Sequence, residues 1–357
     1  MSKKDEIIAN YDPNGLGNSD NIFALPFNED QSELVLIPVP WEVTVSYSAG
    51  TADGPDHIKE ASTQVDLFQK DIKDAWKMGI FYKTPNTALR KSSDEHRALA
   101  EQHIDALENG EADSEEAKAR LKKINQACAQ MVEEVKASTA EQLDKGKLVG
   151  LIGGDHSTPL GFLQALAERH ESFGVLQLDA HMDLRKAYED FEYSHASITY
   201  NFMKLPQIEK LVQVGIRDFC EEEYKYAERH SDKVSIFYDD DIKNGIFDGE
   251  SWNIITDRII KELPDKVYIS FDIDALNPEL CPNTGTPVPG GLKFSEATYL
   301  LHKLVKSGKE IIGFDLNEVA PGEGTDWNGN VGARLLYKLC NLMGVSQGKL
   351  EMVEQMI

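Results

Sequence analysis

Residues 173–183 read FGVLQLDAHMD and set the fold class of this chain. The run Phe173–Leu178 is too short for a helix of such hydrophobicity, and it is typical of a strand buried on both faces of a parallel sheet. Polar residues follow it at once. Because side chains alternate along a strand, we expect Asp179 and His181 to project to the same side. The stretch therefore predicts a strand with acidic and imidazole side chains at its carboxyl end.

Similar short apolar runs recur along the chain and end at polar residues. They lie at Leu34–Val39, Leu148–Ile152, Leu211–Ile216, Val234–Tyr238, Val267–Phe271 and Ile311–Phe314. Helical patterns lie between them, at Pro159–His170, Ser251–Leu263 and Ser295–Lys306. This alternation predicts an α/β fold with a mainly parallel sheet and helices on both faces.

Two segments depart from this rhythm. Residues 91–146 are polar and predict one or two helices around Asn109-Gly110, with an apolar stripe at Ile124, Cys128, Met131 and Val135. We interpret about 84–146 as a docked helical insertion with a solvated outer face; a subunit-contact element is the alternative. Residues 1–32, with their early turn signals, predict an N-terminal arm. We expect a single domain over residues 1–357.

The charge balance excludes several classes of partner. The chain has 37 Lys and Arg against 61 Asp and Glu, a net charge of −24 over 357 residues. Such a surface repels phosphate backbones and attracts small cations, so we expect no nucleic-acid partner. We expect neither a membrane span nor a signal peptide. The 4 cysteines are scattered without a CxxC pair, which is typical of reduced thiols in a cytoplasmic protein.

Acidic and histidine residues follow three of the predicted strands. The motifs are GGDHS at 153–157, DAHMD at 179–183 and DID at 272–274. Ligand sites of parallel sheets lie beyond the carboxyl ends of strands. Neighbouring strands would therefore bring together His156, His181, Asp179, Asp183, Asp272 and Asp274. A single Asp-x-His is often a turn or a cap, but three such motifs after apolar runs indicate a common site.

So many carboxylates repel one another in a buried site unless cations compensate them. Oxygen and imidazole ligands without thiolates suit a pair of divalent ions such as Mn²⁺, with Ni²⁺ or Fe²⁺ open, rather than structural zinc. Two such ions can lower the pKa of a shared water toward neutrality. The motifs therefore predict two divalent metal ions (Mn²⁺ or Ni²⁺) and a hydrolytic reaction.

Together with SFDIDALN at 270–277, GFDLNEVAP at 313–321 and the segment 285–291, these motifs resemble the ureohydrolase superfamily of arginase, agmatinase and formiminoglutamase. The resemblance covers roughly residues 33–343 apart from most of 84–146. It implies a three-layer α/β/α arginase-like fold, with a mainly parallel sheet of about eight strands. It also implies cleavage of a guanidinium C–N bond to urea plus an amine or ammonia, and a homo-oligomer, either a trimer or a hexamer.

The resemblance also implies roles for individual residues. One metal would be held by His156, Asp179, Asp183 and Asp272, and the other by Asp179, His181, Asp272 and Asp274. Glu318 would hold the planar guanidinium, and His195 would pass a proton to the leaving amine. Asp183 or Asp274 would take the proton of the attacking hydroxide.

The sequence leaves the guanidino substrate open. The segment 184–188 resembles the agmatinase branch rather than arginase, and we interpret Arg185 as a salt-bridged scaffold residue rather than a substrate contact. Arginines usual in agmatinases are missing near Ser48 and Ala52. With its helical insertion and its turn-rich N-terminal arm, the chain is similar to guanidine hydrolases of the same superfamily.

Two tryptophans bear on the same choice. Trp41 or Trp327 is expected to narrow the pocket and stack on a guanidinium; packing in the core or at a subunit interface is the alternative. Guanidine is slightly favoured over agmatine-like substrates, and formiminoglutamate comes third. A catalytically silent metal-binding protein stays open, whereas a dinuclear phosphatase is disfavoured because no basic phosphate clamp is present.

Overall fold

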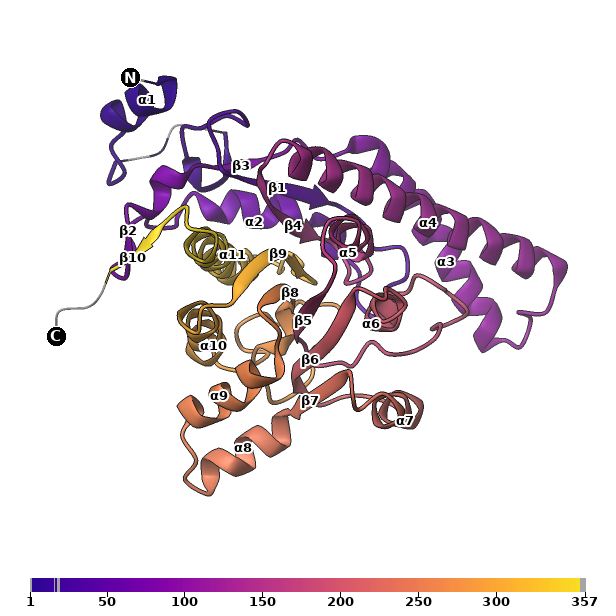
Figure 1. Cartoon of the computed structure of the whole chain (residues 1–357). Helices are drawn as coiled ribbons and strands as arrows, with labels where there is room; N and C mark the ends of the chain where they lie inside the picture. The colour runs from indigo at the N-terminus through magenta and orange to yellow at the C-terminus, as the bar shows by residue number, and fades with distance from the viewer. Residues whose placement is uncertain (1, 16, 18–19, 354–357) are drawn as a thin grey trace.

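The computed structural model describes residues 2–15, 17 and 20–353 (Figure 1). Its centre is an 8-stranded sheet, in which every pair of neighbouring strands is parallel. In spatial order the strands are β3 (Ile80–Tyr82), β1 (Leu34–Val39), β4 (Leu148–Gly153), β9 (Glu310–Asn317), β8 (Lys266–Asp272), β5 (Phe173–Leu178), β6 (Ile208–Ile216) and β7 (Val234–Tyr238). The predicted fold class is confirmed, and each predicted run is a strand. The three-residue β3 was not predicted because it is too short to carry a pattern.

Helices cover both faces of the sheet (Figure 1). On one side lie α2 (Gly54–Ser62), α8 (Asp239–Phe247), α9 (Trp252–Glu262), α10 (Phe294–Lys306) and α11 (Trp327–Ser346). On the other lie α3 (Thr87–Glu108), α4 (Glu115–Asp144), α5 (Leu160–Ala167), α6 (Ile198–Phe202) and α7 (Glu221–Arg229). The side chains of β5 point alternately to the two faces of the sheet. Leu176 and Leu178 pack in the hydrophobic cluster on one face, and Phe173 and Val175 pack in the cluster on the other.

The predicted insertion forms a helical pair. Helices α3 and α4 pack against each other, and α4 also packs against α5 (Figure 1). The stripe residues Ile124, Cys128, Met131 and Val135 are all buried, as predicted. Gly161 of α5 allows the close approach, because a Cβ there would lie 2.2 Å from the carbonyl oxygen of Val132. The insertion is thus fixed to the body along its apolar stripe.

The predicted N-terminal arm contains the short helix α1 (Lys3–Asn10) and then packs into the core. The Ser2 hydroxyl caps α1 by accepting a hydrogen bond from the Asp5 amide at 3.1 Å. Farther along, Ile22, Leu25 and Phe27 are buried in the hydrophobic cluster on the α11 side of the sheet. A small antiparallel sheet pairs β2 (Ile72–Lys73) with β10 (Glu351–Met352).

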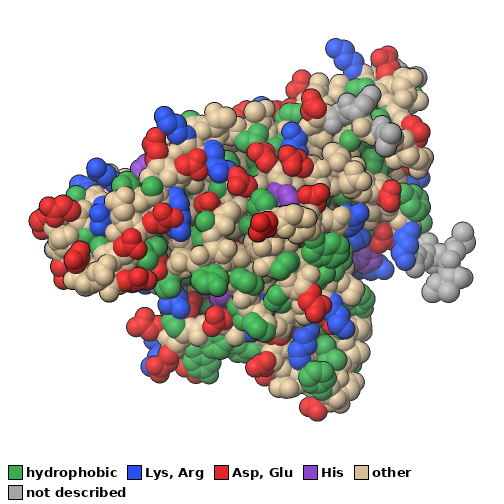
Figure 2. Space-filling model, turned by 180° about the vertical axis from the view of Figure 1, so that it is seen from behind, with side chains coloured by type: hydrophobic (Ala, Val, Ile, Leu, Met, Phe, Trp, Pro, Cys, Tyr) green, Lys and Arg blue, Asp and Glu red, His purple; other side chains and the backbone are tan. Residues whose placement is uncertain are grey.

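On the face seen in Figure 2, Asp and Glu side chains are spread across the visible surface, with Lys and Arg side chains between them. Within the part of the chain that the structure describes, no helix combines the length and the apolar character needed to cross a bilayer. For function, the decisive feature is that β4, β9, β8 and β5 are consecutive in the sheet. Their carboxyl ends meet at one edge.

Candidate active site

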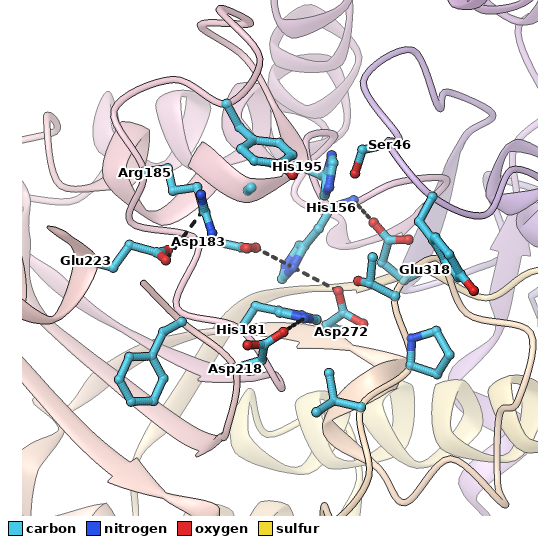
Figure 3. Close-up of a pocket in the computed structure, with 17 residues that line it drawn as sticks. Ser46, His156, His181, Asp183, Arg185, His195, Asp218, Glu223, Asp272 and Glu318 are labelled. Carbon is cyan, nitrogen blue, oxygen red and sulfur yellow. Dashed lines mark hydrogen bonds and ion pairs between the residues drawn. The ribbon is translucent and has the colours of Figure 1, made fainter. Parts of the chain in front are cut away.

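The segments that follow the four central strands bring the predicted ligands to one place. Figure 3 labels His156, His181, Asp183 and Asp272 among them. The residues are His156 after β4, Asp179, His181 and Asp183 after β5, Asp272 and Asp274 at the end of β8, and Glu318 after β9. Gly154 is required just before His156. A Cβ at Gly154 would lie 1.9 Å from the carbonyl oxygen of Trp41, which leaves no room for any other residue.

The ligands form two groups that could each hold a metal ion. In the first, Nδ1 of His156 lies 3.0 Å from Oδ2 of Asp179, 3.3 Å from Oδ2 of Asp183 and 3.2 Å from Oδ2 of Asp272. In the second, Nδ1 of His181 lies 3.0 Å from Oδ2 of Asp274 and 3.6 Å from Oδ1 of Asp179. Asp179 thus turns one oxygen toward each group. The contacts of Asp272 join it to the first group, so its role as a second bridge stays a prediction.

The donor set fits two divalent cations. Nδ1 of His156 is buried and has no hydrogen-bond partner among the described residues, although carboxylate oxygens surround it. Metal coordination satisfies such an atom. Oxygen and imidazole ligands suit Mn²⁺ or Ni²⁺, and no thiol belongs to either group. The residues therefore match a binuclear centre in type and arrangement.

Hydrogen bonds hold these ligands in place from behind. Nε2 of His156 lies 2.9 Å from Oγ of Ser270, so the opposite ring nitrogen faces the carboxylates. The Gln177 amide donates to Oδ2 of Asp179 at 2.7 Å. The backbone amide of Ala180 donates to Oδ1 of Asp274 at 2.9 Å. The ligands are thus held by buried residues of β5 and β8 and by the backbone that follows β5.

Burial and repulsion between closely spaced carboxylates shift the pKa values of several ligands. Burial, followed by the neighbouring Asp274 and Asp179 charges, raises the pKa of Asp272 well above its ordinary value. Burial and Asp179 likewise raise the pKa of Asp183 to about 7. Burial, the largest influence, lowers the pKa of His156, but the carboxylates of Asp179, Asp183 and Asp272 beside its ring raise it well above its ordinary value. Divalent cations would relieve this repulsion.

Glu318 combines backbone strain with a free oxygen. Its φ is 66°, in the left-handed region, and Asp183 has a φ of 53°. Oε1 of Glu318 accepts a hydrogen bond from the His156 amide at 2.7 Å. Oε2 is buried without a hydrogen-bond partner in the described chain, beside Gly285, where a Cβ would lie 2.7 Å from it. One carboxylate oxygen is thus held, and the other is left for a ligand.

His195 is fixed by one residue of an early loop. Oγ1 of Thr44 lies 3.3 Å from Nδ1 of His195 and accepts a hydrogen bond from the His195 amide at 3.1 Å. Burial, followed by the charges of His181 and His156, lowers the pKa of His195 to about 3. Its imidazole is therefore neutral at pH 7 and has a ring nitrogen that can accept a proton.

A cavity of about 340 Å³ lies above the ligands and is lined in part by His156, His181, Asp183, His195, Asp272 and Glu318 (Figure 3). Its outer wall contains Tyr47, Tyr188, Phe219, Arg185, Asp218 and Glu223. Arg185 lies over the Tyr188 ring at 4.7 Å, and its Nε is 3.5 Å from Oε2 of the buried Glu223. This placement agrees with a scaffold role for Arg185.

Neither tryptophan lines this cavity, which corrects the expectation that Trp41 or Trp327 narrows it. Trp41 is completely buried in the hydrophobic cluster below the loop, because its ring packs with apolar residues of the α4 side. Trp327 begins α11, is 46% exposed, and donates through Nε1 to the carbonyl oxygen of Glu279 at 3.0 Å. Core packing, the alternative for Trp41, matches its position.

The aromatic wall was missed. Tyr47, Tyr188 and Phe219 stand in loops without a periodic pattern. Asp218 and Phe219 could have been predicted from the sequence. They come shortly after β6, which neighbours β5, so they lie at the same edge of the sheet as the ligands. No such rule places Tyr47 or Tyr188, because the paths of their loops depend on distant contacts.

A model of the Arginase family matches residues 32–341. The chain belongs to the arginase family. Its relatives include an N(1)-aminopropylagmatine ureohydrolase from Synechocystis sp., 30% identical over 88% of this chain and 90% of that protein. Another is an agmatinase from Bacillus subtilis, 24% identical over 82% of this chain and 85% of that protein.

Solved structures agree on the arginase fold. An agmatine ureohydrolase of Thermoplasma volcanium has a TM-score of 0.69 at 20% identity, covering 97% of this chain and 99% of its own. A proclavaminate amidino hydrolase from Streptomyces clavuligerus has a TM-score of 0.68 at 23% identity, covering 93% and 99%. Members of the arginase family are enzymes that use a binuclear metal centre on small guanidino substrates. The chain is thus a ureohydrolase of the arginase and agmatinase type.

Proposed function

We propose that this chain hydrolyses an extended, cationic guanidino compound of the agmatine class to urea and an amine. The observation that carries this proposal is the outer wall of the cavity, which combines the aromatic Tyr47 and Phe219 with the exposed carboxylate of Asp218. Aromatic faces and a carboxylate recognise a cationic tail. Relatives named agmatinase and N(1)-aminopropylagmatine ureohydrolase support the same class.

The size of the cavity favours an extended substrate over free guanidine. Its volume of about 340 Å³ is many times the roughly 10–15 Å³ that one water molecule needs in a cavity measured in this way. Guanidine has so few atoms that it would leave most of this space to solvent. Trp41 and Trp327, which were expected to narrow the pocket for a short substrate, do not line this cavity.

Asp218 is the carboxylate of the outer wall that is best placed for a cationic tail. Its side chain is 67% exposed and lies 3.9 Å from Nε2 of His181. Glu223 is engaged instead, because it accepts from the backbone amides of Leu184 at 3.0 Å and Cys220 at 2.9 Å and pairs with Arg185. We therefore assign the tail amine to Asp218.

The reaction follows from the arrangement of the side chains. Oε2 of Glu318 accepts hydrogen bonds from the guanidinium and fixes its plane. The His156 and His181 groups would hold two divalent cations, Mn²⁺ or Ni²⁺, which when bound would lower the pKa of the water that serves as nucleophile. Asp183 or Asp274 takes the proton of that nucleophile. The C–N bond to the substituted nitrogen breaks, and the amine leaves with a proton passed through His195.

The test is urea release by protein loaded separately with Mn²⁺ and Ni²⁺, with agmatine, N1-aminopropylagmatine, guanidine and arginine as substrates. Asp218→Asn is expected to raise KM for the two tailed amines about tenfold and to leave weak guanidine turnover unchanged. Asp240→Asn, an exposed residue of α8, is the matched control. Turnover of guanidine alone, or of no substrate with both metals bound, would contradict the proposal.

Two further expectations can be tested with the same preparation. We propose a homo-oligomer, a trimer or a hexamer, and light scattering at assay concentration measures its mass. Cytoplasmic location is proposed on the pattern of free cysteines, since all of Cys128, Cys220, Cys281 and Cys340 are unpaired in the described chain.

A further inference from the structure

The helical insertion contacts the loops of the active site rather than the metal ligands. Helix α3 runs beside the early loop 42–53, which contributes Ser46 and Tyr47 to the cavity. The hydroxyl of Ser93 on α3 accepts a hydrogen bond from the backbone amide of Glu42 at 3.0 Å. At the other end of the loop, Arg90 of α3 pairs with Asp53. Both ends of the loop are therefore tied to the insertion.

Arg97, also on α3, contacts the loop at Val45, between Glu42 and Asp53. Its guanidinium donates to the backbone carbonyl of Val45, and its side chain is 14% exposed with Nε 3.3 Å from a carboxylate oxygen of Glu101. Val45 follows Thr44, whose hydroxyl contacts both the amide and the ring of His195. A short chain of contacts thus leads from α3 to the imidazole that we assign to proton transfer.

The insertion holds a second loop of the same cavity. His103 of α3 lies against the Phe191 ring, with centroids 5.5 Å apart, and its Nε2 is 3.7 Å from a carboxylate oxygen of Asp190. Asn125 of α4 donates to the backbone carbonyl of Asp190 at 3.4 Å. The loop 184–193 carries the arginine and tyrosine of the cavity wall. Two loops from distant parts of the sequence thus share one support.

We propose that Arg97 is a positioning residue of the active site, which orients His195 through the Val45 carbonyl and Thr44. This inference rests on the proposed function, because it assumes that His195 serves turnover. The guanidinium acts on the backbone of the loop, so losing it displaces Thr44 without touching a metal ligand. A small displacement of a proton-transfer group lowers kcat by between about tenfold and a hundredfold.

The experiment compares Arg97→Ala with Arg97→Lys and with Lys91→Ala. Lys91 is the control, since it lies on the same helix, is 78% exposed, and pairs only with Glu95 in the described chain. Arg97→Ala is expected to speed amide hydrogen exchange in residues 43–48 and to lower kcat at least tenfold, with unchanged metal content and little change in KM. Arg97→Lys keeps a donor and restores part of kcat, and Lys91→Ala matches the wild type.

A double variant distinguishes positioning from a general structural role. If Arg97 acts through Thr44, then Thr44→Val removes the same contribution, and adding Arg97→Ala to it lowers kcat little further. Losses that multiply, or unchanged exchange in residues 43–48, would overturn the proposal. If the wild type releases no urea, the proposed function fails; exchange in residues 43–48 of Arg97→Ala still decides whether Arg97 anchors the loop.

Discussion

Replacing Glu318 by Gln separates catalysis from stability at one side chain. Oε1 of Glu318 already accepts the His156 amide, so the single oxygen of Gln is expected to keep that bond. The amide NH₂ would then occupy the place of the free Oε2 and face the N–H groups of the substrate. The variant loses an acceptor at the point where the guanidinium binds.

The magnitude follows from the type of bond that is lost. A hydrogen bond to a charged group contributes about 1.5–3 kcal/mol. Its loss in the transition state lowers kcat/KM roughly 10- to 150-fold. Stability should move the other way in metal-free protein. Burial, followed by the Asp155 charge, raises the pKa of Glu318 well above its ordinary value, so its carboxylate is disfavoured in the folded state. The neutral amide removes that penalty, and the melting temperature rises.

The assay is urea release from agmatine over a range of concentrations, alongside thermal melting of metal-free protein. Glu323→Gln, in the same loop but exposed, is the matched control and retains wild-type values in both measurements. The reasoning is refuted if Glu318→Gln leaves kcat/KM unchanged, or if the melting temperature falls together with activity.

Two more perturbations test other parts of the molecule. Asp179→Asn removes the carboxylate that turns one oxygen toward each ligand group, so a full metal pair should not be retained after dialysis, as elemental analysis would show. Burial, the largest influence, lowers the pKa of His103, so its protonation opposes folding. The free energy of unfolding of the wild type should therefore fall as pH drops below about 6.5. In denaturant titrations, the free energy of unfolding of His103→Gln should fall less over the same pH range.

Asp179→Asn and His103→Gln each have a matched control variant. Asp240→Asn should keep the wild-type metal content, and full loading of Asp179→Asn would show that the carboxylate does not bridge. Lys91→Ala, an exposed position on the same helix as His103, should follow the wild-type dependence on pH. Parallel curves for the wild type and His103→Gln between about pH 7 and about pH 5 would contradict the assigned role of His103.

The sheet and its ligands could be predicted because short-range rules govern them. A strand buried on both faces needs a continuous apolar run, and runs such as Phe173–Leu178 showed it. The ligands follow their strands directly, so predicting the strands also predicted their common edge. The structure added the order β4, β9, β8, β5, which non-local pairing sets and no local pattern reveals.

The cavity wall could not be predicted in the same way. Trp41 and Tyr47 are six positions apart in one loop, yet the first is completely buried and the second is 80% exposed. The path of this loop depends on hydrogen bonds with Ser93 and Arg97. Both residues belong to helix α3 and lie about fifty positions farther along the chain. The sequence alone therefore does not show which aromatic residues of this loop reach the cavity.

The separation between ligands fixed on strand ends and a wall built from loops has a consequence for how such enzymes diversify. Substitutions in residues 43–48, 184–191 and 218–219 can reshape the entrance while the metal-binding carboxylates keep their backbone supports. Because α3 contacts the loops 43–48 and 184–191, one mutation on the face of α3 that packs against them can move both loops at once. A library for new amine substrates should therefore vary that face together with the loops, and it should leave the four central strands untouched.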